Sequence, residues 1–186
     1  MSSGTRAAAT LDDLYKVDGK AELIGGRIVR YMPTGFLPSH IAGEIFASLR
    51  EHARRAGRGI ACTDNLGFAV SRLASGRQSF SPDAAFYAGR LPANRMRFVQ
   101  GPPTFAVEVR SEHDYIEAAE AEIAAKRADY FEAGTLVVWD VDPVAELIRR
   151  YRPDSPDAPM EFRRGEIADA EPAVPGWRVA VDEIFA

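Results

Sequence analysis

The chain has 186 residues, of which 46% are hydrophobic and 27% charged, a composition typical of one globular domain with its own core. The formal net charge of −4 argues against a protein that holds nucleic acid over its whole surface, because such proteins are usually basic. A local basic groove is compatible with this charge.

No apolar run is long enough to cross a membrane, and the opening MSSGTRAAATLDDL lacks the apolar segment of a signal peptide. The single cysteine, Cys62, cannot form an internal disulfide. We therefore expect a cytoplasmic protein without membrane association. We also expect a single domain over residues 1–186, with residues 1–9 as a flexible N-terminus.

The first elements are a short helix and a hairpin. Residues 10–16 (TLDDLYK) predict a helix with Thr10 as its N-cap. Residues 21–32 (AELIGGRIVRYM) predict two strands that are joined at Gly25 and Gly26, a two-residue hairpin signal.

A long amphipathic helix follows from about residue 38 to 55, where apolar residues recur at helical spacing. Strand-like segments cover about 60–71, 79–87 and 104–110. The stretch GRLPANRMRFVQGPP (89–103) is predicted to be a surface loop, because it is rich in Pro, Gly and Arg.

A second long helix is predicted from about Asp114 to Glu132, ending at Gly134. The nearly continuous apolar run in TLVVWDVDP then indicates a central strand. Two further strands follow, in AELIRRYRP and near MEFRRG. This order of elements predicts an α/β (α+β) fold, a mixed sheet flanked by helices.

Two strands carry carboxylates among apolar residues. Asp83 stands at the head of the strand in SPDAAFYAG, and Glu108 lies within the strand in TFAVEVRS. Alternation places both acids on faces that they share with alanines. Because isolated buried carboxylates are costly, we consider that the two converge on a divalent cation such as Mg²⁺. The alternative is that Glu108 pairs with Arg110, and that Asp83 caps a turn after Pro82.

The second long helix offers two cations to the same region. An apolar stripe of Ile116, Ala119, Ile123 and Tyr130 has Lys126 at one edge and Arg127 at the other. Either side chain can direct its charge toward the sheet while its stem packs on apolar surface. The alternative is a cation that points into solvent.

Arginines gather in two places that could hold phosphates. One group lies near the end of the first long helix (Arg50, Arg54, Arg55, Arg58), and the other lies in the loop after the Asp83 strand (Arg90, Arg95, Arg97). The helix group fits a solvated face that complements the helix dipole. The loop group is the better candidate for substrate contacts, because binding residues concentrate on loops.

The segments AELIGGRIV, PTGFLPSHIAGEI, SPDAAFYAG, FAVEVRS, AAKRADYFEAGTLVVWDVDP and PGWRVAVDEIFA, in this order and spacing, resemble a large bacterial family of restriction-endonuclease-like proteins. This family belongs to the PD-(D/E)xK nuclease superfamily, and the resemblance covers residues 11–186. It implies a restriction-endonuclease-like fold and a Mg- or Mn-dependent endonuclease that acts on DNA.

The resemblance also implies roles for particular residues. Asp83 matches the aspartate of the PD motif and Glu108 the acid of the second strand, both as metal ligands. Glu22 matches an N-terminal glutamate that would complete the metal site. Arg110 stands where the basic pattern has lysine, and arginine cannot readily accept a proton. The family resembles one in which this lysine has moved to the following helix, at Lys126 rather than Arg127.

His40 matches a histidine near the start of the family's first long helix, where it would touch substrate or orient Glu22. Without the resemblance, a histidine at this position is more simply a structural residue or a helix cap.

Three features depart from the family: Gly25 in place of Asp, SEH in place of SPS after Glu108, and a longer segment before Lys126. These departures leave room for an inactive site.

The leading hypothesis is therefore a Mg²⁺- or Mn²⁺-dependent DNA endonuclease that acts as a homodimer if it cuts both strands. The rival is a non-catalytic module that keeps the fold and binds DNA or a protein. A third reading is hydrolysis of a phosphate ester outside nucleic acid. A non-catalytic module would tolerate Asp83→Ala without a change in metal affinity.

Overall fold

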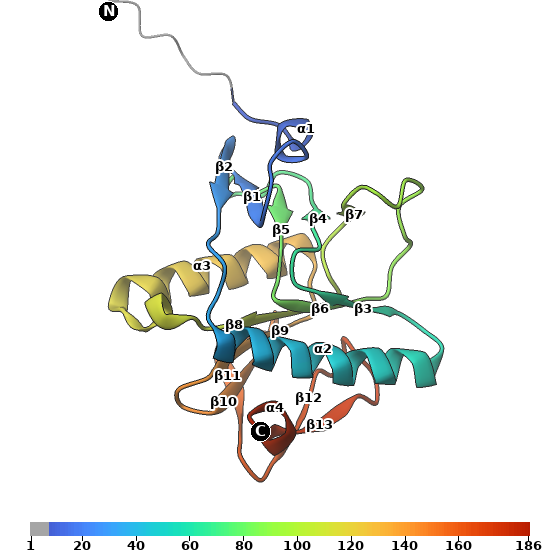
Figure 1. The fold of residues 1–186 in the computed structure, drawn as a ribbon, viewed down its shortest axis with the longest axis vertical. Helices are drawn as coiled ribbons and strands as arrows, with labels where there is room; N and C mark the ends of the chain where they lie inside the picture. The colour runs from blue at the N-terminus through green and yellow to red at the C-terminus, as the bar shows by residue number, and fades with distance from the viewer. Residues whose placement is uncertain (1–7) are drawn as a thin grey trace, which may run out of the picture.

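The computed structural model describes residues 8–186, and its centre is a six-stranded mixed sheet (Figure 1). β8 and β9 run parallel, and every other neighbouring pair in this sheet is antiparallel. In spatial order the strands are β11 (Ser155–Arg163), β10 (Leu147–Arg152), β9 (Val137–Asp142), β8 (Phe105–Val109), β6 (Ala84–Tyr87) and β3 (Ile60–Thr63).

Two long helices cover opposite faces of this sheet (Figure 1). α2 (Phe36–Ala56) packs Ile41, Ile45 and Leu49 against one face, and it ends at Gly57 in the left-handed conformation. α3 (Glu117–Ala133) packs Tyr130 against the other face and ends at Gly134, as predicted. The two apolar sets are the reason why the helices lie where they do.

The main hydrophobic core lies between α2 and the face of the central sheet that α2 covers. It contains Phe105, Trp139 and Trp177, whose rings contact one another with centroids 5.0–5.7 Å apart. The C-terminal elements close this core: β12 (Ile167–Asp169), β13 (Arg178–Ala180) and α4 (Val181–Ile184). The indole N–H of Trp177 donates to Ser48 of α2 at 3.0 Å.

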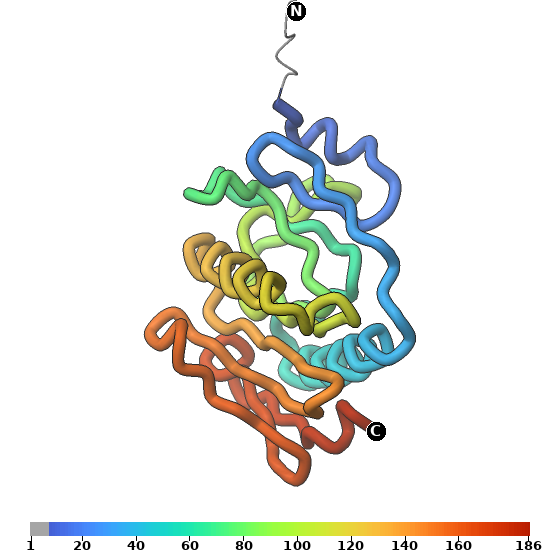
Figure 2. The backbone as a smooth tube through the Cα atoms, turned by 90° about the vertical axis from the view of Figure 1, so that its left-hand side faces the viewer, coloured from blue at the N-terminus to red at the C-terminus, as the bar shows by residue number. Residues whose placement is uncertain are grey.

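The N-terminal elements lie at the other end of the molecule from the β10–β11 hairpin, with α3 between them (Figure 2). They are α1 (Leu11–Leu14), capped by Thr10 as predicted, and the hairpin of β1 (Ala21–Ile24) and β2 (Arg27–Arg30). A small sheet of β5 (Ser79–Phe80), β4 (Phe68–Ala69) and β7 (Val99–Gln100) lies beside them.

The β1–β2 hairpin is fixed to the segment that leads into β5. The Leu23 amide donates to the Ser79 hydroxyl at 2.8 Å, and the Gly25 amide donates to the Gly76 carbonyl at 2.9 Å. Gly25 and Gly26 both have positive φ (56° and 70°), the conformation that a two-residue hairpin turn requires. This anchoring brings the outer edge of β1 toward the central sheet.

The predicted restriction-endonuclease-like mixed sheet flanked by helices is confirmed, with local differences. The predicted second helix starts at Glu117, after a 3₁₀ turn, η1 (Glu112–Tyr115), and Ile116 is 62% exposed rather than part of the apolar stripe. The predicted loop at 89–103 contains β7. Residues 1–7 of the expected flexible N-terminus lie outside the described residues, whereas the Ala9 amide donates to the Gly26 carbonyl at 2.8 Å.

No helix in the described part of the chain is long and apolar enough to span a membrane.

Candidate active site

Three acids form a row across three neighbouring strands on the face of the sheet under α3. The pairs Ala84–Val107 and Ala85–Ala106 set a register that, continued by one residue, places Asp83 opposite Glu108. Glu108 is in turn paired with Asp140 of β9. Because side chains alternate along each strand, Ala84 next to Asp83 and the neighbours on either side of Glu108 and Asp140 belong to the main core.

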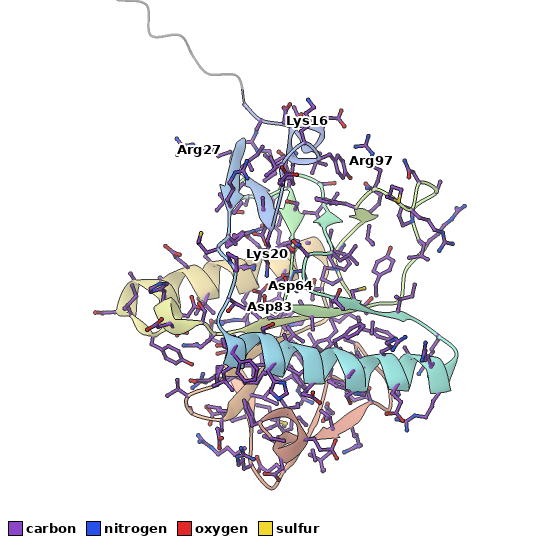
Figure 3. All side chains as sticks on the ribbon, in the orientation of Figure 1. Lys16, Lys20, Arg27, Asp64, Asp83 and Arg97 are labelled. Atoms are coloured by element: carbon purple, nitrogen blue, oxygen red, sulfur yellow. The ribbon has the colours of Figure 1, made fainter. Side chains whose placement is uncertain are left out.

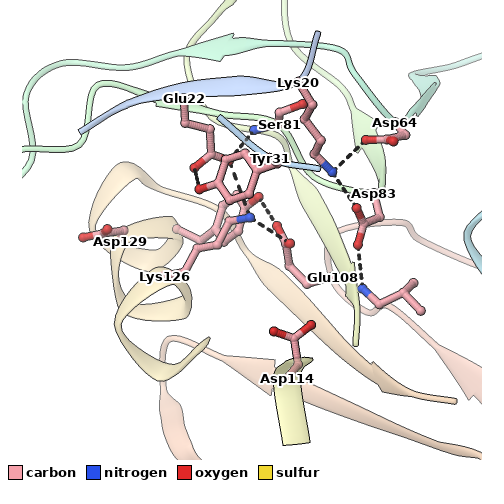
Figure 4. Close-up of polar contacts among 12 residues, drawn as sticks. Lys20, Glu22, Tyr31, Asp64, Ser81, Asp83, Glu108, Asp114, Lys126 and Asp129 are labelled. Carbon is pink, nitrogen blue, oxygen red and sulfur yellow. Dashed lines mark hydrogen bonds and ion pairs between the residues drawn. The ribbon is translucent and has the colours of Figure 1, made fainter. Parts of the chain in front are cut away.

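Each acid in the row binds a cation from a different part of the chain, and Figure 4 shows the contacts of Asp83 and Glu108. Asp83 Oδ1 is 2.6 Å from Lys20 Nζ, and Glu108 Oε2 is 2.8 Å from Lys126 Nζ. Asp140 binds Arg110 through two hydrogen bonds of 2.6 and 2.7 Å. Each of the three carboxylates therefore has a different cation within hydrogen-bond distance.

Helix α3 directs two groups at Glu108. Lys126 and Tyr130 are four residues apart, so they lie one above the other on one side of the helix. The Tyr130 hydroxyl donates to Glu108 Oε1 at 2.6 Å, while Lys126 binds Oε2. Burial, followed by the charge of Glu108, raises the pKa of Tyr130. Burial alone lowers the pKa of Lys126, but Glu108 and Glu22 raise it above its ordinary value, so the ammonium stays charged.

Glu22 lies on the other side of Lys126 and is fully buried. Its Oε1 accepts from the Ser81 amide at 2.9 Å and lies 3.5 Å from Lys126 Nζ. Its Oε2 accepts from the Tyr31 hydroxyl at 2.9 Å and from Arg77. Burial alone raises the pKa of Glu22, but Lys126, Arg77 and these hydrogen bonds hold it below its ordinary value. Both oxygens are therefore occupied.

Glu108 has the opposite electrostatic balance. Burial raises its pKa, and the negative charges of Asp83 and Glu22 act in the same direction, against the effect of Lys126. Its side chain keeps 25% of its surface exposed, and that of Asp83 keeps 21%. These two acids are accessible to a ligand, in contrast to Glu22.

A cleft of about 830 Å³ opens above the row of acids. Its lining includes Lys20, Asp83, Glu108 and Lys126, together with residues of η1 and of the segment after β2. Carboxylates and cations therefore face the same open space, with α3 on one side and the N-terminal hairpin on the other.

The contacts at the cleft identify the partner of Arg110 and distinguish Lys126 from Arg127. Arg110 binds Asp140 and, at 2.9 Å, Glu120, so the alternative in which Glu108 pairs with Arg110 is wrong. Lys126 faces the acids, whereas the Arg127 guanidinium stacks over the Tyr151 ring at 3.7 Å. Asp83 accepts from the Val109 amide at 2.8 Å and thereby links the ends of β6 and β8.

The residues expected to touch substrate lie outside the cleft. Arg90 and Arg95 are exposed in the 89–103 loop, and Arg97 lies 4.2 Å from the Tyr15 ring centroid and 3.7 Å from Asp12. His40 stacks on Phe36 at the start of α2, with ring centroids 5.6 Å apart. None of the four is among the residues that line the cleft.

Several residues of the site were not identified from the sequence, among them Lys20, Asp64 and Asp140. Asp140 carried a signal, because the WDVD run alternates acids with apolar residues along a strand, as the Glu108 strand does. Lys20 is one of three lysines in the chain, so its position was informative in principle. Its contacts, Asp83 and Asp64, are distant in sequence, and no local pattern predicts them.

The donor chemistry of the cleft fits a magnesium-type ion. The accessible donors are carboxylate oxygens, and two ammonium groups already stand where a cation would bind them. Among residues 8–186, no group of three or more His, Cys, Asp and Glu side chains is arranged to hold a metal. Mg²⁺ needs only one or two protein carboxylates when water and phosphate complete its shell, so Asp83 and Glu108 suffice.

The sequence pattern of the Uma2 family, described as "putative restriction endonuclease", matches residues 8–182. The chain belongs to the Uma2 family. The match spans the cleft, both long helices and the whole central sheet, and it confirms the resemblance found in the sequence. No curated protein matches the chain.

A solved structure shares the fold over nearly the full length. It is a crystal structure from Anabaena variabilis, described as a "putative nuclease belonging to DUF820", with a TM-score of 0.73 and 19% identity. The alignment covers 95% of this chain and 97% of the other. At this identity the likeness establishes the fold.

Proposed function

We propose that this Uma2 protein is a divalent-metal-dependent endonuclease that hydrolyses phosphodiester bonds in DNA. The observation that carries the proposal is the pair of partly exposed carboxylates, Asp83 and Glu108, adjacent on neighbouring strands at the floor of one cleft. Family membership and the fold of the Anabaena protein support the same class of chemistry.

Asp83 and Glu108 would hold the ion. A Mg²⁺ or Mn²⁺ ion there would polarise the scissile phosphate and lower the pKa of an attacking water. Because the pKa of Glu108 is raised, a proton would compete with the ion for this carboxylate as the pH falls. The Val109 amide donates to Asp83 and the Tyr130 hydroxyl donates to Glu108, and these two hydrogen bonds support the proposal by fixing one oxygen of each carboxylate.

Lys126 would stabilise negative charge on the phosphoryl oxygens. Its raised pKa keeps it protonated, so it is suited to donate hydrogen bonds rather than to accept a proton from water. The 2.8 Å contact between Lys126 Nζ and Glu108 Oε2 supports this role, because Glu108 is one of the two proposed ion ligands.

Glu22 would position Lys126 rather than bind the ion. The sequence resemblance implied a metal ligand here, but both oxygens of Glu22 are occupied by protein donors and the side chain is fully buried. In this arrangement Tyr31 and Arg77 hold Glu22 in place, and Glu22 Oε1 lies 3.5 Å from the Lys126 ammonium.

The test is cleavage of DNA by the full chain. Plasmid and short single- and double-stranded DNA are incubated with Mg²⁺ or Mn²⁺, with chelator as a control, beside the Asp83→Asn variant. We expect cleavage that requires the metal and is lost in the variant. Metal-independent DNA binding without cleavage would favour a non-catalytic module, and cleavage of RNA or of small phosphodiesters alone would reassign the substrate.

A further inference from the structure

Lys20 bridges two carboxylates at the edge of the cleft. Its Nζ lies 2.6 Å from Asp83 Oδ1 and 2.8 Å from Asp64 Oδ1 (Figure 4). Figure 3 shows these three residues together between the N-terminal elements and the central sheet, whereas Lys16, Arg27 and Arg97 lie at the periphery. Lys20 directly precedes β1, and Asp64 directly follows β3.

The contact occupies the cleft-facing side of Asp83. Oδ2 of Asp83 accepts from the Val109 amide, which leaves Oδ1 as the oxygen that Lys20 binds. A divalent ion that approaches Asp83 from the cleft therefore meets an ammonium group on the oxygen it needs. Because two cations on one oxygen repel each other, the ion and Lys20 compete for this position.

The three acid–cation pairs differ in how readily the cation can leave. Arg110 is held by two hydrogen bonds to Asp140 and a third to Glu120. Lys126 is held between Glu108 and the fully buried Glu22. The second partner of Lys20 is Asp64, whose side chain is half exposed and lies outside the row of acids. Lys20 can therefore release Asp83 without becoming unpaired.

We propose that Lys20 is a positioning residue whose ammonium is displaced from Asp83 by the divalent ion and is retained by Asp64 beside the substrate phosphate. The inference rests on the proposed function, since it requires an ion at Asp83. In the metal-free protein, Lys20 on Asp83 lowers the affinity for the metal ion. In the metal-bound protein, Lys20 is a second lysine, beside Lys126, that can contact the phosphodiester.

The chain offers a direct readout, because Lys16, Lys20 and Lys126 are its only lysines. With ¹³C-labelled lysine, the side-chain Cε signals of all three are resolvable by NMR and assignable by single substitution. We expect Mg²⁺ to move the Lys20 and Lys126 signals and to leave Lys16, which is exposed and pairs with Asp13, unchanged. Dimethyl phosphate added to the Mg²⁺-saturated protein should then move the Lys20 signal again.

A second measurement distinguishes a direct effect of the Lys20–Asp83 contact on metal affinity from a long-range effect of lysine charge. Mn²⁺ affinity is measured for the wild type, Lys20→Met and the charge-matched control Lys16→Met. We expect Lys20→Met to bind Mn²⁺ about tenfold more tightly, and Lys16→Met to bind like the wild type. The difference should persist from about 0.1 M to 1 M salt, because a long-range effect would be screened as the Debye length falls from ~10 Å to ~3 Å.

The outcomes distinguish this inference from the proposed function. Metal binding with a stationary Lys20 signal, or with equal affinity in Lys20→Met, overturns the displacement and leaves the metal site in place. A Lys20 signal that ignores dimethyl phosphate overturns the phosphate contact. Absence of metal binding at Asp83 in every variant, including Lys20→Met, overturns the proposed metal site itself.

Discussion

The two faces of the central sheet are built from alternate residues of the same strands, and both are partly apolar, but only the α3 face carries the row of acids. On the α2 side, Phe105, Trp139 and their neighbours form a continuous apolar core that the C-terminal elements close. On the α3 side, Asp83, Glu108 and Asp140 stand in a row, each with its own cation. The α2 face therefore contributes the main apolar core, whereas the α3 face combines a second apolar cluster with a row of charges that the sheet holds in place.

The comparison predicts that substitutions on the apolar face act on stability first. Trp139 is fully buried between Phe105 and Trp177, so Trp139→Ala should lower the free energy of unfolding by about 3–5 kcal/mol. Leu136, which precedes β9 and is 41% exposed, is the control, and Leu136→Ala should cost less than about 1 kcal/mol. Urea denaturation measures both, and equal losses would contradict the division between the faces.

On the ionic face, Lys126 should matter for activity more than its sequence neighbour. Lys126→Met is expected to reduce metal-dependent DNA cleavage at least about a hundredfold, because the charge beside the phosphate is lost. Arg127→Met removes a cation that stacks on Tyr151 instead, and should leave the cleavage rate within about twofold. Initial rates of DNA cleavage are compared for the two variants. A larger loss in Arg127→Met than in Lys126→Met would assign the catalytic cation to Arg127.

The charge of Glu22 on the ionic face should make the free energy of unfolding depend on pH. Its pKa in the folded protein is below its ordinary value of 4.5, so its charge contributes stability above pH 4.5, and this is lost as the pH falls through the folded pKa. Glu22→Gln should cost about 1.5–3 kcal/mol at pH 7. It should also flatten the decline of stability below pH 4.5. Urea midpoints between pH 3 and 7 test this, and an unchanged acid slope would show that Glu22 is not the charged partner of Lys126 and Arg77.

The smallest effect on stability is expected at the two proposed metal ligands. In Asp83→Asn/Glu108→Gln the amide oxygens still accept from Val109 and Tyr130, while Lys20 keeps Asp64 and Lys126 keeps Glu22. Both side chains are also partly exposed. We therefore expect a change in unfolding free energy below about 1 kcal/mol. A loss like that of Trp139→Ala would make the row of acids a structural feature.

The sequence predicted features that depend on local periodicity. Alternation along the strands placed Asp83 and Glu108 on the correct face, and the positions of Gly25, Gly26 and Gly134 located a turn and a helix end. Helical spacing alone did not separate Lys126 from Arg127; the family resemblance did.

The remaining features depend on contacts between distant segments. Lys20 reaches Asp83 because the β1–β2 hairpin is fixed along residues 76–79, a tether that no local pattern encodes. Arg110 pairs with Asp140 rather than Glu108 because β8 and β9 are parallel neighbours in register. The burial of Glu22, for which the family resemblance implied a metal-ligand role, follows from the same hairpin placement, which also puts Glu22 within 3.5 Å of Lys126.

The measurement that tests the central claim most directly is calorimetric titration of the full chain with Mn²⁺, in parallel with the Asp83→Asn/Glu108→Gln variant. We predict that the wild type binds Mn²⁺ and that the folded variant does not. We further predict that affinity rises with pH as Glu108, whose pKa is raised, loses its proton. Equal binding by wild type and variant, with or without a DNA oligonucleotide present, would contradict a metal site at these two carboxylates.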